Sequence, residues 1–174
     1  MAEEKLIASF AVDHTNLKPG IYVSRQDTFD GTPVTTYDIR MTSPNQEPAM
    51  SPAAIHTIEH IIATWLRNNP LWSDRVVYWG PMGCLTGMYL IMHGSYTPQE
   101  IRQLMLEAYQ HLAQYDGPVP GAYPACCGNY LMHDLPMAKW EAKRYLQRLQ
   151  DDFHCQYPNV QRPQDQSGAI FYDA

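Results

Sequence analysis

Apolar and polar residues alternate along the first half of the chain, which is the pattern of β-strands. Residues 6–12 alternate in a mostly apolar setting, and Tyr37, Ile39 and Met41 alternate with polar neighbours that include Arg40. A period of two residues is typical of a strand with one buried face, and a charge such as Arg40 on the other face would ordinarily be solvated. Further apolar runs predict strands at residues 21–23, 76–79 and 88–92, with turns at residues 18–20, 30–33 and 80–84.

Helical periodicity replaces this alternation in three stretches. Ser51 can cap a helix that has Pro52 at its first position and apolar residues three or four apart. Thr97 and Glu100 have the spacing of a capping box, and Asp134 can cap a last helix. Because the first strands are joined by short connections, they should pair in antiparallel fashion. The sequence therefore predicts an α+β fold, with a single antiparallel sheet and helices packed mainly on one face.

Length and composition fit one globular domain. The chain has 174 residues, 45% hydrophobic and 17% charged, so we expect a single domain over residues 1–174 with an irregular tail at 151–174. The net charge of −6 argues against a general nucleic-acid binder. No apolar run approaches the ~18 residues that span a bilayer, and residues 1–5 lack a signal-peptide core. The protein is therefore expected in the cytoplasm, away from membranes.

Candidate chemistry is concentrated in the run His56-Thr57-Ile58-Glu59-His60. On a helix, this H-x-x-E-H spacing places the two imidazoles about 40° apart, with the carboxylate in the same sector. Two imidazoles one turn apart can bind a divalent ion, and a carboxylate beside them can move protons. Two histidines are too few for a stable site, so a third ligand must come from elsewhere.

The four cysteines include candidates for that third ligand. Cys126 and Cys127 follow a loop rich in proline and glycine, and Cys84 follows a glycine in a predicted turn. In a reducing compartment a thiol acts as a ligand, a catalyst or a small core residue more often than as half of a disulfide. The residues alone leave the choice between these thiols open, and they leave open that the Cys-Cys pair belongs to the core.

Seven short segments carry more information together than any of them does alone. They are Ser9-Phe10, Asp13-His14-Thr15, Tyr37-Asp38-Ile39-Arg40, His56-Thr57-Ile58-Glu59-His60, Pro81-Met82-Gly83-Cys84, Thr86-Gly87 and Cys127-Gly128-Asn129-Tyr130. These segments occur in the order seen in the S-ribosylhomocysteine lyase family, also called LuxS, which the chain therefore resembles. The resemblance spans residues 9 to about 146, and jointly its motifs are highly specific.

The resemblance implies a homodimer with active sites near the subunit interface. It implies a metal, usually Fe²⁺ with zinc or cobalt able to replace it, held by His56, His60 and Cys127. It assigns proton transfer to Cys84 and Glu59, and binding of a small-molecule substrate to Ser9, His14 and Arg40, the first two reaching across the dimer. Arg40 also supplies the cation that a thiol needs to become a useful base.

The family reaction is cleavage of the thioether of S-ribosylhomocysteine. Its products are homocysteine and 4,5-dihydroxy-2,3-pentanedione, the precursor of the quorum-sensing signal autoinducer-2. A thioether β to a carbonyl leaves by elimination, so the ribose carbonyl must first migrate from C1 to C3 through enediolates. A metal stabilises their negative oxygens, and two acid/base groups move the protons. The resemblance thus implies a carbon–sulfur lyase.

Two departures from the family pattern lie near Cys84. The stretch Tyr78-Trp79-Gly80 replaces an acidic residue, an aliphatic residue and a serine, and Leu85 replaces arginine or glutamine. In the family the acidic residue would meet the ammonium group of homocysteine. We therefore expect a divergent member with weaker or altered recognition of the amino-acid end of the substrate.

Two other classes of protein remain as alternatives. An H-x-x-E-H metallopeptidase would need a distant glutamate as third ligand, for which Glu107 and Glu141 are available, but it would leave Cys84 and Cys127 unexplained. A non-enzymatic protein with a structural metal would have a closed fourth coordination position and no turnover.

Overall fold

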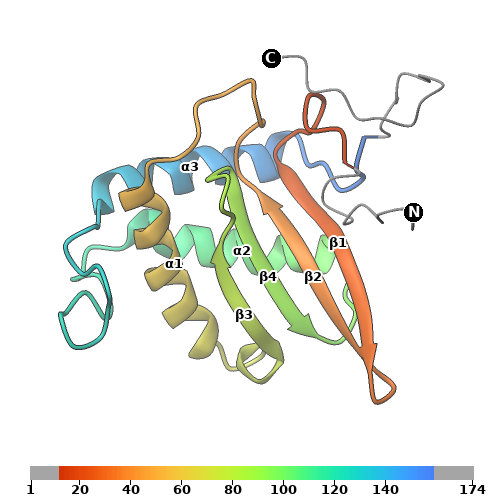
Figure 1. The fold of residues 1–174 in the computed structure, drawn as a ribbon, viewed down its shortest axis with the longest axis horizontal. Helices are drawn as coiled ribbons and strands as arrows, with labels where there is room; N and C mark the ends of the chain where they lie inside the picture. Colours follow the sequence, from red (N-terminus) through yellow and green to blue (C-terminus); the bar gives the residue numbers. More distant parts are fainter. Residues whose placement is uncertain (1–11, 159–174) are drawn as a thin grey trace, which may run out of the picture.

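The structure, a computed structural model, describes residues 12–158. Four strands form one antiparallel sheet in the order β1-β2-β4-β3, with the bounds Gly20–Phe29 for β1, Thr32–Arg40 for β2, Val76–Pro81 for β3 and Gly87–His93 for β4. The helices are α1 at Pro52–Arg67, α2 at Pro98–Gln114 and α3 at Leu135–Asp151, and a 3-10 turn, η2 at Ser73–Arg75, precedes β3 (Figure 1). The predicted α+β class is confirmed.

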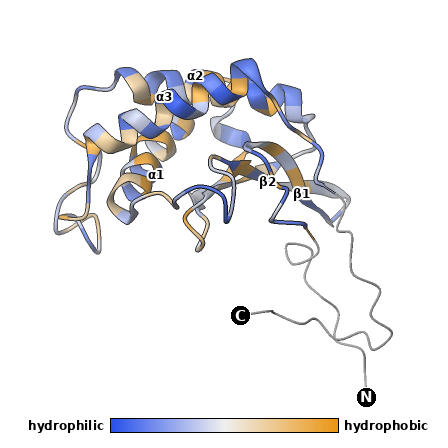
Figure 2. Cartoon of the chain, turned by 90° about the horizontal axis from the view of Figure 1, so that it is seen from above, coloured by the Kyte–Doolittle hydropathy of each residue, from blue (hydrophilic) through white to orange (hydrophobic). Residues whose placement is uncertain are grey.

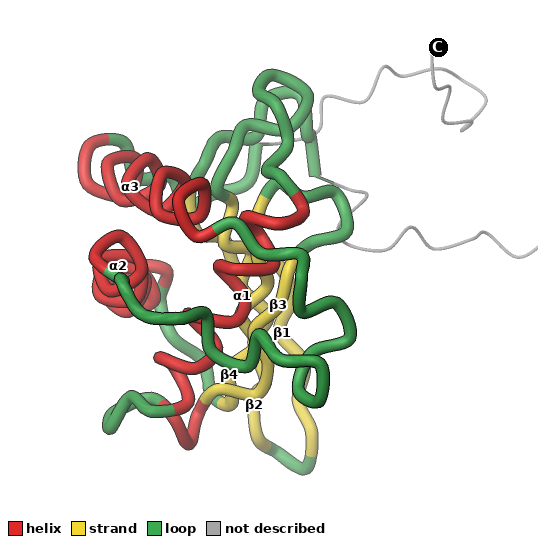
Figure 3. Tube along the Cα trace, turned by 90° about the vertical axis from the view of Figure 1, so that its left-hand side faces the viewer, coloured by secondary structure: helices red, strands yellow, loops and turns green. Residues whose placement is uncertain are grey.

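The three helices lie on one side of the sheet (Figure 3). α1 contacts β3, α2 contacts β1, and α3 packs along α2. Hydrophilic residues cover much of α2 and α3, whereas α1 is largely hydrophobic (Figure 2). A helix that is apolar around most of its circumference is buried on more than one side, and α1 accordingly contacts the sheet and both other helices. Apolar side chains fill the layer between sheet and helices, among them Ile39, Leu90, Ile58 and Leu104.

The predicted capping residues occupy the helix starts. The Ser51 hydroxyl accepts a backbone N–H from the first turn of α1, with Pro52 next to it. Thr97 and Glu100 form a reciprocal capping box at α2, and the Asp134 carboxylate accepts a backbone N–H at α3. Each cap satisfies N–H groups that have no partner inside the helix, which explains why these helices begin where they do.

The first hairpin extends further than its apolar residues predicted. β1 pairs with β2 over its whole length of Gly20–Phe29, with one register shift between Val23 and Arg25, instead of ending after residue 23. Asp30 and Gly31, with φ of 47° and 78°, form the two-residue turn, so the end of the predicted turn at 30–33 belongs to β2. The half of this hairpin next to the turn is held by hydrogen bonds between the strands rather than by burial of side chains. Alternation of apolar and polar residues indicates only strands with a buried face, so it does not detect this half.

Both ends of the chain extend beyond the described part. The predicted strand at 6–12 lies outside it except for Val12, and residues 159–174 of the predicted tail lie outside it as well. After α3, residues 152–158 contain only an isolated bridge between His154 and Gly20. Within the described residues, no helix has the length and apolar character needed to cross a membrane.

The side of the sheet turned away from the helices carries polar residues. Strand register places Tyr22, Asp38 and Tyr89 side by side across β1, β2 and β4. Two residues further along β2, Arg40 pairs with Gly87 of β4. Because successive strand residues point to opposite faces, this outer face holds Asp38 and Arg40 while their neighbours enter the core. The sheet thus positions an acid and a base together on its outer face.

Candidate functional site

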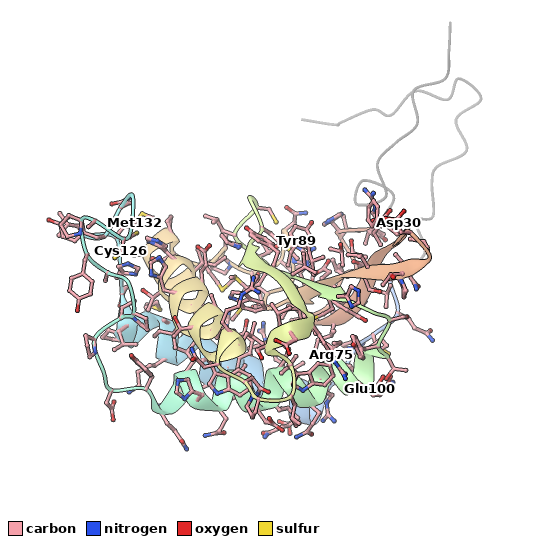
Figure 4. The ribbon with its side chains drawn as sticks, turned by 90° about the horizontal axis from the view of Figure 1, so that it is seen from below. Asp30, Arg75, Tyr89, Glu100, Cys126 and Met132 are labelled. Carbon is pink, nitrogen blue, oxygen red and sulfur yellow. The ribbon has the colours of Figure 1, made fainter. Side chains whose placement is uncertain are left out.

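Four side chains with metal-binding atoms meet beside α1. They are His56, His60, Cys127 and His133, and their ligand atoms all lie within 4.8 Å of one another. The two helical histidines lie one turn apart as predicted, and the other two residues come from the segment that joins α2 to α3. Figure 4 shows this segment, labelled at Cys126 and Met132, next to α1.

The structure distinguishes the two adjacent cysteines. The Cys127 sulfur lies 3.4 Å from His56 Nε2, and it accepts the backbone N–H of Asn129 at 3.4 Å. Cys126 is exposed and does not belong to the cluster. The choice that the residues alone left open therefore falls on Cys127.

Backbone carbonyl groups set the direction of the two helical imidazoles. His56 Nδ1 lies 2.8 Å from the Met132 carbonyl oxygen, and His60 Nδ1 lies 2.7 Å from that of Pro120. A carbonyl oxygen can only accept, so each Nδ1 carries the hydrogen and each Nε2 keeps a free lone pair. This is the usual arrangement of histidines that bind a metal through Nε2.

His133 was not predicted as part of the site. Its Nδ1 lies 3.2 Å from the Thr57 hydroxyl oxygen, whose only hydrogen is donated to the Ala53 carbonyl at 2.8 Å. His133 Nδ1 must therefore donate, and its Nε2 has a free lone pair, buried without a hydrogen-bond partner among the described residues. Burial, followed by the neighbouring His56 and His60, lowers the pKa of His133. Its position six residues after Cys127 was the available sequence signal.

Ring orientation shows that His56 and His133 do not both face one ion. His133 stacks on His56, with ring centroids 4.2 Å apart and planes at 21°, whereas His60 meets His56 edge-on at 88° and His133 at 72°. Nearly parallel rings cannot both direct in-plane lone pairs at one ion, while edge-on rings can. Sulfur and nitrogen bound to one tetrahedral ion lie about 3.6 Å apart, close to the separation of Cys127 and His56. The donor set His56, His60 and Cys127 thus fits a transition metal.

A pocket of about 370 Å³ lies on the outer face of the sheet. Its lining brings together three of the predicted site residues, His14, Arg40 and Cys84, and it also includes Asp38, Tyr89 and Tyr157. The fourth predicted residue of this region, Ser9, lies outside the described residues. The pocket collects groups from both ends of the described chain around the Cys84 thiol.

Arg40 is buried, unlike most charged residues on the polar face of a strand. Its side chain is 4% exposed, and Asp38 accepts from its Nε at 3.0 Å and from its Nη2 at 2.6 Å. A guanidinium group is buried at low cost only when it is paired with an acid. Asp38 and Arg40 are two residues apart on a strand, and this spacing places both side chains on the same face of the sheet. That spacing was the signal which sequence reasoning missed.

A tight turn presents Cys84. β3 continues to Pro81, so the turn occupies residues 82–86 rather than the predicted 80–84. Leu85 adopts a φ of 58°, a conformation that costs a non-glycine residue roughly 1–2 kcal/mol. Backbone hydrogen bonds to Met82 and Met50 hold it there, and its side chain packs against the core. Cys84 is thereby left exposed at the pocket.

Two neighbours tune the Cys84 thiol. Arg40 Nη1 donates to the Thr86 hydroxyl oxygen at 2.5 Å and lies 3.8 Å from the Cys84 sulfur. The Thr86 hydroxyl hydrogen is then free to donate to that sulfur, 3.1 Å away. Burial raises the pKa of the thiol, but hydrogen bonds from Thr86 and the charge of Arg40 outweigh it, so the net pKa lies below its usual value. The site favours a thiolate closer to neutral pH.

The pocket and the metal cluster lie close together. Met50, just before α1, donates its backbone N–H to the Leu85 carbonyl at 2.9 Å, which ties the Cys84 turn to the start of the histidine helix. Half-buried Glu59 lies on α1, one residue before His60. Figure 4 places Tyr89 of the pocket on the same side of the molecule as the cluster loop. The start of α1 therefore links the turn that carries Cys84 to the helix that carries His56 and His60.

The unusual stretch before Pro81 forms a coupled pair on β3. Tyr78 is 46% exposed, and its hydroxyl occupies the space where a side chain on Gly80 would project. Trp79, between them, is buried in the core. Tyr78 in this orientation therefore requires glycine at position 80.

The glutamates available to a metallopeptidase do not reach the cluster. Glu141 is buried on α3 and forms an ion pair with Arg144, and exposed Glu107 accepts a hydrogen bond from Gln103. The third ligand group is a thiol instead, so the metallopeptidase alternative does not fit this site.

Comparison with known proteins agrees with this geometry. The model of the family S-Ribosylhomocysteinase (LuxS) matches residues 7–155. The chain belongs to the LuxS family. A LuxS-family relative from Phocaeicola vulgatus, an S-ribosylhomocysteine lyase, is 58% identical over 145 residues, which cover 83% of this chain and 90% of that protein.

Two further LuxS-family relatives are also S-ribosylhomocysteine lyases. The one from Porphyromonas gingivalis is 54% identical over 83% of this chain and 91% of its own length. The one from Borreliella burgdorferi is 50% identical over 88% of this chain and 99% of its own length. The family match thus covers all four residues of the cluster and Cys84.

Proposed function

We propose that the chain is a metal-dependent carbon–sulfur lyase that cleaves S-ribosylhomocysteine to homocysteine and 4,5-dihydroxy-2,3-pentanedione. The observation that carries this proposal is the pairing of a His/His/Cys cluster with a thiol of lowered pKa in the adjoining pocket. Membership of the LuxS family, with S-ribosylhomocysteine lyases at 50–58% identity, supports the same reaction.

The metal of the proposed enzyme is Fe²⁺, held by His56, His60 and Cys127. Imidazole and thiolate ligands suit iron, zinc and cobalt better than magnesium or calcium, and ferrous iron is the usual metal of the family. When bound, the metal supplies a Lewis acid for the oxygens of the substrate. The carbonyl groups of Met132 and Pro120 keep the two imidazoles in the tautomer that can bind it.

Cys84 and Glu59 transfer the protons in this proposal. Moving the carbonyl along the sugar requires removal of a proton from one carbon and its delivery to the next. Cys84 can act as a base because Arg40 and Thr86 favour its thiolate. Glu59 acts from the helix side, next to the cluster. General acid–base groups of this kind each contribute about 10²–10⁴-fold to the rate.

His14, Arg40 and Ser9 are proposed to bind the substrate. His14 Nδ1 donates to the Val12 carbonyl at 2.9 Å, which leaves Nε2 free to accept from a sugar hydroxyl. The proposed enzyme is a homodimer, with the sheet face that no described helix covers near the interface. His14 lines the pocket of its own chain, so its contribution across a dimer stays a prediction. Four free thiols fit the reducing cytoplasm.

The deciding experiment measures thiol release. Protein loaded with Fe²⁺ under anaerobic conditions should release one homocysteine for each S-ribosylhomocysteine consumed, together with the dihydroxypentanedione. Metal-free protein is the control, and it should recover activity when Fe²⁺ is added back. Exposure to air should reduce activity, because ferrous iron and an accessible thiolate both oxidise. Absence of thiol release from fully loaded protein would contradict the proposal.

A further inference from the structure

Tyr157 is a wall of the Cys84 pocket, although it lies two residues beyond the part of the chain that matches the LuxS family model. We propose that Tyr157 is a positioning and specificity residue for this pocket. Its hydroxyl fixes the ion pair of Asp38 and Arg40, and its ring closes the pocket above β1. The proposal rests on the proposed function for the role of Cys84, but its first test does not depend on turnover.

The segment that carries Tyr157 is fixed to the edge of the sheet. After α3 the chain returns to β1, where Ile21 donates its backbone N–H to the His154 carbonyl at 2.9 Å. Gly20 allows this approach, because a Cβ there would collide with the His154 carbonyl oxygen. This contact between His154 and β1 places Tyr157, three residues further along the chain, on the outer face of β1.

The Tyr157 ring and hydroxyl each have a defined partner. The ring stacks on buried Tyr22, with centroids 4.6 Å apart and planes at 10°. The hydroxyl donates to Asp38 Oδ2 at 3.0 Å. Burial, and then the charge of Asp38, raises the pKa of Tyr157 far above its usual value, so this hydroxyl keeps its hydrogen at neutral pH. The protonated Tyr157 hydroxyl is therefore able to donate to the carboxylate.

A continuous set of contacts connects Tyr157 to the thiol. Asp38 Oδ2 accepts from both Tyr157 and Arg40, whose other terminal nitrogen reaches Thr86 and Cys84. The hydrogen bond from the Tyr157 hydroxyl partly neutralises the negative charge of the Asp38 carboxylate. The carboxylate then offsets less of the positive charge of Arg40. More of the positive charge of the guanidinium group is then available to the Cys84 sulfur. His14, Tyr22, Tyr89, Asp152 and Cys155 are the other titratable groups around this set.

The ring of Tyr157 also limits the size of the pocket. Ser24 and Tyr157 line it above β1, whereas Gly83 and Cys84 line it from the turn between β3 and β4. Loss of the ring would remove one boundary and leave a bound substrate more freedom of position. The expected consequence is a higher Michaelis constant, because positioning contacts act through a closely fitting site.

The test separates the hydroxyl from the ring. Tyr157→Phe keeps the stack on Tyr22 and removes the hydroxyl that donates to Asp38. Alkylation of Cys84 by iodoacetamide is followed against pH, with the peptide containing Cys84 quantified by mass spectrometry. The pH midpoint should rise by about half a unit, which corresponds to a roughly threefold slower reaction near pH 7. Tyr157→Ala should also raise the Michaelis constant for S-ribosylhomocysteine.

Tyr96→Phe is the matched control. It removes a tyrosine hydroxyl that donates to the His93 carbonyl at the opposite end of β4, about 20 Å from the pocket end of that strand. Its alkylation profile should equal that of the unmodified protein. If Tyr157→Ala fails to fold, Tyr157→Phe still decides the question.

The outcomes distinguish this inference from the proposed function. An unchanged alkylation profile in Tyr157→Phe overturns the role of Tyr157 even if the protein cleaves S-ribosylhomocysteine. A shifted profile in a protein that releases no thiol supports the role of Tyr157 while contradicting the proposed reaction.

Discussion

The metal cluster and the Cys84 pocket lie close together but obtain their chemistry in different ways. In the cluster, the backbone carbonyl groups of Met132 and Pro120 orient the imidazole rings of His56 and His60. In the pocket, polar and charged side chains act on one another: Thr86 and Arg40 lower the pKa of the Cys84 thiol, and Asp38 holds Arg40 in place. The metal cluster thus depends on the conformation of the backbone, whereas the Cys84 pocket depends on polar and charged side chains.

This difference predicts how each region responds to substitution. A carbonyl group of the backbone cannot be removed by changing a side chain, so the aim of the imidazoles should survive most nearby substitutions. The pocket has no such protection, because single side chains hold its ion pair. Loss of metal and loss of proton transfer should therefore be separable, and the predictions that follow test that separation.

The largest effect is expected for Cys127→Ala. Removing a ligand should lower metal affinity by more than about 100-fold, since even residues that only support a ligand contribute 10–100-fold. Metal content after anaerobic preparation, measured by elemental analysis, should fall from about one ion per subunit to a trace.

Two matched variants test the choice of ligands. Cys126→Ala should keep its metal, because Cys126 is exposed outside the cluster. His133→Phe, which preserves a flat ring against His56, should keep it too. Equal metal retention by Cys127→Ala and Cys126→Ala would show that the ligand assignment is mistaken.

The next effect is on turnover with the metal retained. Cys84→Ala and Glu59→Gln should bind metal normally and lose roughly 10²-fold or more in rate, which is the usual scale of acid–base catalysis. The two measurements, metal content and thiol release, must be made on the same preparation. Near-native turnover in either variant would remove that residue from the mechanism.

Asp38→Asn should mainly affect stability. The Asp38 and Arg40 side chains are 3% and 4% exposed, and removing one partner of a buried pair costs about 3–5 kcal/mol in the free energy of unfolding. Asp116→Asn is the control, because its pair with Lys139 is at the surface and should contribute below about 1 kcal/mol. Urea unfolding compares the two, and similar losses would show that the pair is not effectively buried.

The smallest effect is expected at the amino-acid end of the substrate. Tyr78→Asp restores an acid where the family has one, and it should lower the Michaelis constant up to about tenfold, as a charge-assisted hydrogen bond allows. A ribosyl thioether without the amine should gain nothing from this change. A large preference of the unmodified protein for the amine-bearing substrate would show that the ammonium is already recognised.

The sequence by itself determined the features that depend on neighbouring residues. The start of α1, the spacing of His56 and His60 and the capping of α2 and α3 arise within a few residues, where periodicity and hydrogen bonding to the next turn decide the conformation. The α+β class followed because alternation and helical periodicity occupy separate stretches. The order of seven motifs was also enough to indicate the family, later confirmed by the match over residues 7–155.

Only the tertiary structure decided which distant residues meet. The approach of Cys127 to His56, the stacking of His133 on His56 and the burial of Arg40 depend on where a loop or a strand face packs. The position of Tyr157 depends on a bridge between segments more than 130 residues apart. Such contacts are fixed by burial and by the satisfaction of polar groups across the whole fold, and no local pattern encodes them.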